Sequence, residues 1–505
     1  MQPSIPLVGL SPGDPTPGNY LEVNFAAGEV SSGGGVYSIL IIGGMLSSGT
    51  ATADTVIYGP DTSVQMASEA DVIALFGDGS EVHRMWRRIT ALNLSTPIYA
   101  IAVSEGSLAS AAGATIALSG PATSAGAVRV FIGDEFVDAG FATGDSATTI
   151  AANVATAMNS RGHWAVTATP SSSNILVTAK QKGPRGNFIR YFALVLPSSS
   201  GIAVTPTAST AMSGGATADS NATALTTIAA QRFYYIVSAA EDATQLGALV
   251  SQVNTAALAV TGIRQRVFGG AVNTLSSAVS VATSLNAARC ELSWLAGSDV
   301  PPAELAANAA AVYALEEAPR VPRCNFSSYG NDAKTSGNWK IKAPLSGLMP
   351  TRGQIMSALN AGLTPIGVLS AGRTYLVKRV TTRFLNGSNP DYRIRDAHKV
   401  TICDRFADDL KAKEEAQLAG KNIGDDPVKN EEPNPNTVTP RVYNALILRL
   451  ILDYGELGLL QRVNEIVAGT KAIREANPAT RLSAQIPLQP VDILDQTAAQ
   501  INQVA

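Results

Sequence analysis

The sequence predicts an α/β core, in which a mixed or parallel sheet is flanked by helices, with a small inserted α+β domain and a C-terminal α+β domain. Extended arms are predicted at both ends of the chain. Three observations lead to this fold class. Apolar strand-like segments alternate with amphipathic helical segments. A compact series of strand-like segments and one helical segment lies between two charge-poor borders. Beyond residue 363, strand periodicity is followed by helical periodicity.

The first part of the core is expected over residues 36–105. Its Val36–Gly43 segment is continuously apolar, as in a strand that is buried on both faces of a sheet. Helix starts are predicted at Ser68 and Ser80, and a second strand at Pro97–Val103. Strand, helices and strand in this order are typical of a parallel sheet that is covered by helices.

The second part of the core is expected over residues 229–362, where the same alternation resumes. Strands are predicted at Phe233–Val237, Arg266–Gly270 and Arg289–Leu295, with helical periodicity between them. An Ala-rich helix is predicted over Pro301–Glu317. The two parts together predict one sheet, whose strands come from both sides of an insertion.

Residues 106–228 are expected to form the inserted domain, which protrudes from the core. The stretch 106–127 has no charged side chain, and the stretch 197–228 has only Asp219. Between these borders lie a hairpin pattern at Val128–Val137, a helical pattern and three further strand-like segments. Insertions are tolerated where flexible linkers border them, so this composition favours a separate unit.

Residues 363–480 are expected to form the C-terminal domain. Its Thr374–Phe384 segment is rich in β-branched and aromatic side chains, which favour a strand. A polar turn then leads to helical periodicity over Val400–Leu410. An acidic, Pro-rich linker at Lys421–Pro440 precedes a strongly apolar helix, which is predicted from Val442 to about Val463.

The two arms, residues 1–35 and 481–505, each contain one strand pattern. The alternating apolar positions are Leu21, Val23 and Phe25 in the first arm and Leu482, Ala484, Ile486 and Leu488 in the second. Both strands are short and flanked by Pro or Gly, so neither is expected to be stable alone. Pro487 and Pro490 restrict the second strand to the edge of a sheet.

The composition indicates a globular protein that is poor in charge. Of its 505 residues, 46% are hydrophobic and 15% are charged, and the formal net charge is −3. This balance gives no general attraction to nucleic acid or anionic lipid. The early apolar run Ser38–Leu46 is shorter than the ~20 residues of a membrane-spanning helix. Three widely spaced cysteines, and no Lys or Arg before Arg84, predict a protein made in a reducing cytoplasm without a secretory signal.

The sequence contains no strong catalytic, cofactor or metal motif. Gly9–Gly13 matches the string of a nucleophile elbow, but it lies in a Pro-rich arm and not between a strand and a helix. His83 and His398 are the candidate bases, and both fall in or at the start of predicted helices, where a solvated or capping role is ordinary. We expect no enzyme, no cofactor and no metal site. An α/β hydrolase or peptidase without a recognisable motif is the alternative.

A local cluster of basic residues follows the first strand of the C-terminal domain. Its members are Lys378, Arg379, Arg383, Arg393 and Arg395. The cluster lacks the interleaved aromatic residues that stack on bases in single-stranded nucleic acid. We therefore expect these cations to pair with carboxylates, either within the chain or on acidic neighbours.

Several segments resemble one known family. The order Leu363–Pro365, then Val377–Arg383, then Asp391–Asp396 at the entry to a long helix resembles the C-terminal core of contractile tail sheath proteins. The further matching strings are Ala26–Gly28, Gly35–Tyr37, Phe76–Ser80 and Lys182–Asn187. The chain is similar over nearly its whole length to sheath subunits of Mu-like contractile phages. The long Lys421–Pro440 linker departs from that pattern.

This resemblance implies a structural subunit of the virion with a subtilisin-like core and a C-terminal sheath domain. Copies would stack as rings around a tail tube, then contract and drive the tube through the host envelope. The implied partners are other copies of the chain, the tail tube protein, and the baseplate and tail terminator proteins. No direct contact with nucleic acid and no stable membrane insertion are implied. Assembly is expected in the host cytoplasm, and no proteolytic triad can be placed on this sequence.

In this family, neighbouring subunits are joined through terminal arms and a C-terminal sheet. We expect both arm strands to add to a neighbour's sheet, beside the strand predicted at Thr374–Phe384. The interface candidates are Leu21, Val23, Phe25, Tyr375, Val377, Arg379, Leu482, Ala484, Ile486 and Leu488. A Ser/Thr-rich cell-surface adhesin is a third hypothesis, against which the missing signal sequence argues.

Overall fold

An eight-stranded sheet lies at the centre of the chain. The structure is a computed structural model, which describes residues 37–317, 326, 329–330, 339–345, 347–369, 372–427 and 434–495. In sheet order the strands are β16 (Thr374–Leu376), β15 (Thr364–Val368), β14 (Cys290–Trp294), β13 (Arg266–Ala271), β12 (Tyr235–Ser238), β1 (Ile39–Gly44), β3 (Ile98–Val103) and β2 (Ile57–Tyr58). The six inner strands are parallel and the two edge strands antiparallel, which confirms the predicted mixed sheet.

Helices cover both faces of this sheet. In β1, Ile39 and Ile41 face one hydrophobic cluster, whereas Leu40 and Ile42 face the other, because successive side chains of a strand point to opposite faces. The helices on the first face are α1 (Glu69–Phe76), α2 (Glu81–Thr90) and α7 (Pro302–Glu317). Those on the second are α4 (Ala222–Ile228), α5 (Ala243–Ala256), α6 (Leu275–Leu285) and α9 (Arg352–Asn360). The predicted helix starts at Ser68 and Ser80 are confirmed, since both side chains cap their helices.

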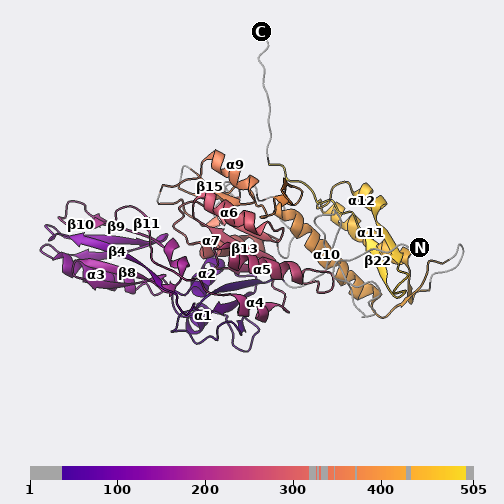
Figure 1. The fold of residues 1–505 in the computed structure, drawn as a ribbon, viewed down its shortest axis with the longest axis horizontal. Helices are drawn as coiled ribbons and strands as arrows, with labels where there is room; N and C mark the ends of the chain where they lie inside the picture. Colours follow the sequence, from indigo (N-terminus) through magenta and orange to yellow (C-terminus); the bar gives the residue numbers. More distant parts are fainter. Residues whose placement is uncertain are drawn as a thin grey trace, which may run out of the picture.

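The inserted region, residues 106–228, forms two four-stranded sheets with a hydrophobic cluster of their own. One sheet contains β10 (Ala203–Thr205), β4 (Ala111–Ser119), β8 (Asn174–Lys182) and β7 (Val166–Ser171). The other contains β11 (Thr210–Ala211), β9 (Arg190–Leu196), β5 (Gly126–Ile132) and β6 (Glu135–Phe141). Helix α3 (Ala147–Asn159) packs on them, followed later in the chain by the 3₁₀ turn η1 (Pro184–Phe188). Figure 1 shows this group at one end of an elongated molecule, and its domain boundaries stay a prediction.

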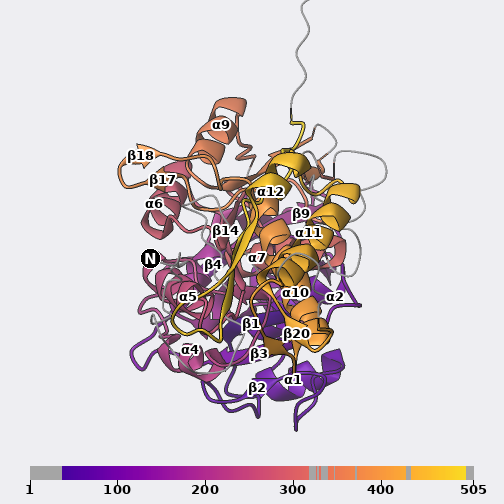
Figure 2. The same cartoon turned by 90° about the vertical axis from the view of Figure 1, so that its right-hand side faces the viewer.

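The C-terminal elements lie at the opposite end of the molecule (Figure 1). They are α10 (Ala397–Leu418), α11 (Pro440–Glu456), α12 (Val463–Gly469), β21 (Lys471–Arg474) and β22 (Leu482–Gln485), with the short pair β19 (Asn422–Ile423) and β20 (Thr437–Val438). The other short pair, β17 (Leu385–Asn386) and β18 (Asn389–Pro390), lies beside α6 of the core (Figure 2). Helix α10 runs from the central sheet to the other C-terminal elements, and the end-on view of Figure 2 shows α10 and α11 in front of the core. One side of α10 joins α11, α12 and β22 in a fourth hydrophobic cluster.

The strand predicted at Thr374–Phe384 is mostly wrong, because only Thr374–Leu376 pairs in the sheet. The chain then leaves the sheet because its side chains bond to the core. Thr364 Oγ1 and the backbone of Val380 exchange hydrogen bonds of 2.9 and 3.0 Å. The hydroxyl of Thr382 donates to the Ala287 carbonyl. Polar anchoring thus replaces the sheet ladder after three residues.

Three further differences lie near the C-terminus. The apolar helix ends at Glu456 rather than near Val463, since Gly458 adopts a φ of 70° that ends the helix. Part of the predicted linker is paired, as β19 and β20 form a parallel two-stranded sheet. The strand β22 pairs antiparallel with β21 of its own chain, whereas the sequence predicted pairing with a neighbouring copy.

The separate cluster of the inserted region generates a test. Replacing Ala111–Ser220 by a short Gly/Ser linker should leave the central sheet folded, because the apolar side chains of the inserted sheets pack mainly on one another. Circular dichroism should show helical signal retained and one cooperative thermal transition. The isolated segment 106–221 should give a β-rich spectrum. Aggregation of the shortened chain without a transition would show that the insert belongs to the core.

Candidate functional site

The crevice where an α/β enzyme would bind its ligand is filled in this chain. Open α/β sheets bind ligands outside the carboxyl ends of their strands, where the strand order reverses. Here that point lies between β1 and β12, which have β3 and β13 on opposite sides. The cavity there has a volume of about 20 Å³ and is lined by Arg185 and Asp219 of the inserted region. Such a volume has room for about one water molecule.

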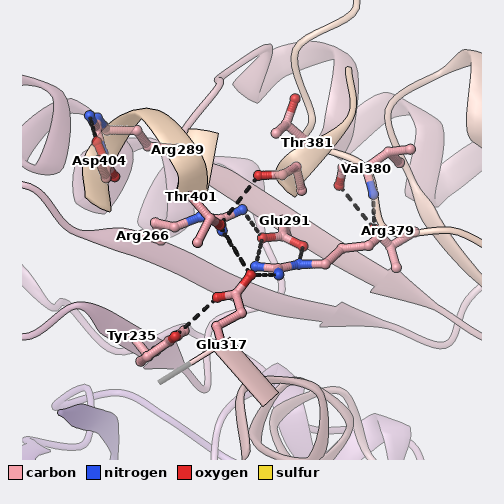
Figure 3. A network of polar contacts seen from close by, with 12 residues as sticks. Tyr235, Arg266, Arg289, Glu291, Glu317, Arg379, Val380, Thr381, Thr401 and Asp404 are labelled. Carbon is pink, nitrogen blue, oxygen red and sulfur yellow. Dashed lines mark hydrogen bonds and ion pairs between the residues drawn. The ribbon is translucent and has the colours of Figure 1, made fainter. Parts of the chain in front are cut away.

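A buried ionic junction lies at the opposite, amino edge of the same strands (Figure 3). Its four charged members are Arg266 at the start of β13, Glu291 in β14, Glu317 at the end of α7, and Arg379 after β16. We call these four residues the ionic junction. All four side chains are at most 3% exposed. The carboxylate of Glu317 lies where the end of α7 meets the starts of the strands.

Arg379 is the central cation of the ionic junction. Its Nε lies 2.6 Å from Glu291 Oε2 and its Nη2 lies 2.8 Å from Glu291 Oε1, a bidentate arrangement. Its Nη1 donates to Glu317, and its guanidinium carbon lies 3.9 Å from the centre of the Tyr313 ring. Burial would lower the pKa of Arg379, but Glu291 and Glu317 outweigh burial and raise it well above its usual value.

Arg266 and two hydroxyl groups complete the pairing of the carboxylates. Arg266 donates to Glu291 and to Thr401 of α10. The Thr401 hydroxyl donates to Glu317 Oε1 at 3.1 Å, and the Tyr235 hydroxyl donates to Glu317 Oε2 at 3.0 Å. Two cations and two anions therefore balance in a site without bulk water, which is the condition under which buried charges are tolerated.

A second set of ion pairs fastens α10 beside the junction. Arg289 donates to both carboxylate oxygens of Asp404 at 2.7 Å, and Arg232 donates to Asp408 at 2.7 Å. Thr401, Asp404 and Asp408 are spaced by three and four residues, so they lie on one side of the helix. The apolar side of α10 belongs to the C-terminal cluster. The helix thus joins the core through charges and the C-terminal elements through apolar contacts.

The predicted charge pairing of the basic cluster is confirmed for several members. Lys378 lies 2.9 Å from Asp396 and Arg395 lies 3.6 Å from the same carboxylate. Arg393 pairs with Asp391 at 2.9 Å. These contacts are all within the chain.

Both candidate bases are buried and not solvated, but His83 has the expected capping role, because its Nδ1 accepts the Gly79 amide at 3.0 Å at the start of α2. His83 has no exposed surface, and its Nε2 lies 3.1 Å from Glu69 Oε1. His398 is 3% exposed and its Nε2 lies 2.8 Å from the Val491 carbonyl oxygen. Burial lowers the pKa of both imidazoles. The nucleophile-elbow string at Gly9–Gly13 lies outside the described residues.

No metal site or membrane-spanning helix is found in the part of the chain that the structure describes. Within it, no group of three or more His, Cys, Asp or Glu side chains could hold a metal ion. No helix among these residues has both the length and the apolar character needed to cross a membrane.

Comparisons with known proteins find a sequence similarity to a tail sheath protein. No family model matches the chain. It is similar to the Mu-like prophage FluMu tail sheath protein of Haemophilus influenzae, with 24% identity over 219 residues. The match covers 42% of this chain and 42% of that relative, so it spans less than half of the relative's length.

The resemblance to tail sheath proteins is confirmed. Among solved structures, the chain is similar to the sheath tail protein of Listeria innocua, at a TM-score of 0.47 and 11% identity, over 92% of this chain and 93% of that one. For the sheath tail protein of Desulfitobacterium hafniense the TM-score is 0.44, with 10% identity over 87% of this chain and 90% of that one. For the anti-feeding prophage helical sheath in its contracted state the TM-score is 0.46, with 10% identity over 97% of this chain and 99% of that one.

The residues named as sheath interface candidates are dispersed in the structure. Leu21, Val23 and Phe25 lie outside the described residues. Tyr375 and Val377 are half-buried at the edge of the central sheet, whereas Arg379 is buried in the ionic junction and is not available to a neighbour.

The C-terminal interface candidates are held by their own chain. Leu482 and Ala484 are half-buried in the hairpin with β21. Ile486 and Leu488 are buried in the C-terminal cluster, because the alternation predicted for a neighbour's sheet is satisfied inside the chain.

The ionic junction generates a stability test. Replacing Arg379 by Met keeps the length of the side chain but leaves Glu291 and Glu317 without their main cation. Removal of one partner of a buried ion pair costs about 3–5 kcal/mol, so chemical denaturation should show a loss of that size.

The matched control is Arg449→Met, since Arg449 pairs with Asp453 at 2.9 Å while the two side chains are 72% and 32% exposed, and Lys413 still pairs with Asp453 in that variant. Exposed ion pairs are screened by water, so this variant should unfold like the unmodified protein. Equal losses in both variants would contradict the structural role assigned to the junction.

Proposed function

We propose that the chain is a structural subunit of a contractile tail sheath, which polymerises around a tail tube and contracts to drive the tube through the host envelope. The observation that carries this proposal is the 219-residue match to a tail sheath protein. The proposal includes a non-enzymatic role, and it is supported by the filled crevice at the switch point of the sheet. No observation on the described residues favours the hydrolase alternative.

The ionic junction supports a mechanical role. A contracting sheath needs subunits that transmit force without deforming, while the contacts between subunits rearrange. The charges of the junction come from the sheet, from α7 and from the segment after β16, and those of the second set tie α10 to the sheet. Sliding α10 along the sheet would separate buried opposite charges, which is costly in a site without water. The core and α10 would therefore move as one body.

The proposed partners follow from this role. They are other copies of the chain in stacked rings, the tail tube protein, and the baseplate and tail terminator proteins, with no direct contact to nucleic acid. The proposed location is the virion, after assembly in the host cytoplasm.

Strand addition remains our proposal for the N-terminal arm. The sheet formed by β21 and β22 has two strands, and no third described strand pairs with it. Its free edges are one acceptor for an added strand, because unpaired backbone groups at a sheet edge favour pairing with another chain. The edge of β16 is the other acceptor, although bridges at Tyr329 and Lys342 cover part of it. In this proposal Leu21, Val23 and Phe25 form one side of the added strand.

Polymerisation is the first test of this function. At rising concentration, or with the tail tube protein present, the purified chain should form hollow tubes in negative-stain electron microscopy. Sedimentation that shows a stable monomer at every concentration, with tube protein present, would contradict the proposal.

Removal of the N-terminal arm is the second test. Deleting residues 1–27 should leave the monomer folded, because the hydrophobic clusters of the described chain begin at Tyr37 and Ile39. The deletion should abolish tube formation, measured by sedimentation and microscopy.

A matched pair of full-length variants separates strand addition from other roles of the arm. Replacing Leu21, Val23 and Phe25 by Ser should prevent assembly, whereas replacing Glu22 and Asn24 by Ser should permit it. Normal assembly of the apolar triple variant would show that the arm does not add as a strand.

A further inference from the structure

The inserted region is fastened to the core at the carboxyl edge of the central sheet. η1 (Pro184–Phe188) carries Arg185 to the switch point between β1 and β12. Gln181 of β8, four residues before Arg185, donates its side-chain amide to the Met45 carbonyl at 2.8 Å. The second border of the insert returns through Asp219, whose backbone carbonyl accepts from Gln245 of α5 at 2.8 Å. Phe188 of η1 packs against the hydrophobic cluster of the core, so the insert makes both polar and apolar contacts in this crevice.

Four charged side chains meet in this crevice, and we call them the crevice cluster: Glu81, Arg185, Asp219 and Glu241. Arg185 lies 3.1 Å from Glu81 of α2 and also pairs with Asp219. Glu81 is 3% exposed and accepts the Gly44 amide at 2.9 Å. Asp219 accepts the Gly106 amide at 3.0 Å. Three carboxyl groups from three parts of the chain thus surround one guanidinium from the insert.

Glu241 is the member of the cluster that stands outside this pairing. It follows β12, is half-buried, and lines the crevice together with Arg185. The other charged groups on the crevice are Asp242, which caps α5, and Arg84 of α2, which pairs with Glu304. With Glu81 and Asp219 already bonded to Arg185, a charge on Glu241 is poorly compensated. Burial, with Glu81 and Asp242 nearby, outweighs Arg185 and raises the pKa of Glu241 from 4.5 to about 7.

We propose that Glu241 is a proton-dependent latch that holds the inserted region against the carboxyl edge of the central sheet. When its carboxyl is neutral, the crevice closes around one guanidinium and two carboxylates. When it is ionised, the poorly compensated negative charge is relieved by opening the crevice further to water, which requires η1 and the segment around Asp219 to withdraw. The proposal concerns the docking of the insert and does not depend on the proposed function.

The direction of the pH dependence follows from linkage. The docked state holds the Glu241 proton more tightly than an open, solvated state, in which the pKa is near its usual 4.5. Docking is therefore strongest below about pH 4.5, weakens as the pH rises toward about 7, and changes no further above that. Because Glu241 is only half-buried, we expect the equilibrium constant for docking to change by at least about tenfold, which is less than the full pKa shift would give.

Amide hydrogen exchange on the full-length protein tests the latch. Protection factors, corrected for the intrinsic effect of pH, should fall at least about tenfold in Gly183–Phe188 and Thr217–Asn221 between about pH 5 and pH 7.5. Protection in β1 should stay constant. In Glu241→Gln, whose amide imitates the neutral carboxyl, the two segments should stay protected at both pH values.

Two further variants keep the test decisive. Glu105→Gln removes a carboxylate that pairs with Lys182 at 3.1 Å between the core and the end of β8, and it should show the pH dependence of the unmodified protein. Glu241→Ala, checked for folding by circular dichroism, should lack that dependence like Glu241→Gln. A constant protection in the unmodified protein, or the same fall in both Glu241 variants, would overturn the proposal.

Discussion

The pairing of Arg379 with Glu291 and Glu317 is the interaction on which the arrangement of the molecule depends. The two carboxylates come from the sheet and from the end of α7, and the guanidinium comes from the segment that leads into α10. None of these charges has access to bulk water, so each is tolerated only while its partners stay in place. The segment after β16 therefore leaves the sheet and follows its arginine inward. α10 then begins at a position from which Thr401 and Asp404 reach the core.

Two of the polar joints that connect the parts of the chain differ in character, and the inserted region is also joined to the core by the Arg88–Asp134 and Arg190–Asp299 ion pairs. The joint at the amino edge of the sheet has balanced charges, and the bidentate pair of Arg289 with Asp404 beside it resists rotation of α10. The joint at the carboxyl edge has more carboxyl groups than cations around Arg185, so its strength depends on protonation. Under the proposed function, force would pass through the C-terminal part, whereas the contacts of the inserted region around Arg185 would weaken as Glu241 ionises.

Much of the fold could be predicted because the relevant signals are local. Strands buried on both faces, such as β1, are continuous apolar runs in the sequence. Ser68 and Ser80 are typical N-cap residues, and they mark the starts of α1 and α2. The charge-poor borders indicated the insert. β21 was missed because Lys471–Arg474 is short and two of its four residues are charged. β22 pairs with this strand, whereas its predicted partner was a neighbouring chain.

The ionic junction could not be predicted, because Glu291 and Asp404 look like solvent-facing charges in the sequence. Asp404 meets Arg289 from 115 residues further along the chain, a distance over which no periodicity carries information. The one available signal was that charged residues stand at the starts of apolar strands, as at Arg266 and Glu291.

Cryo-electron microscopy of the assembled chain around its tube, in an extended and a contracted form, tests the central claim most directly. The account predicts a polymer in which Arg379 stays within hydrogen-bond distance of Glu291 and Glu317 in both forms, while the contacts between copies change. A polymer in which α10 separates from the sheet on contraction, with these pairs broken, would contradict the account.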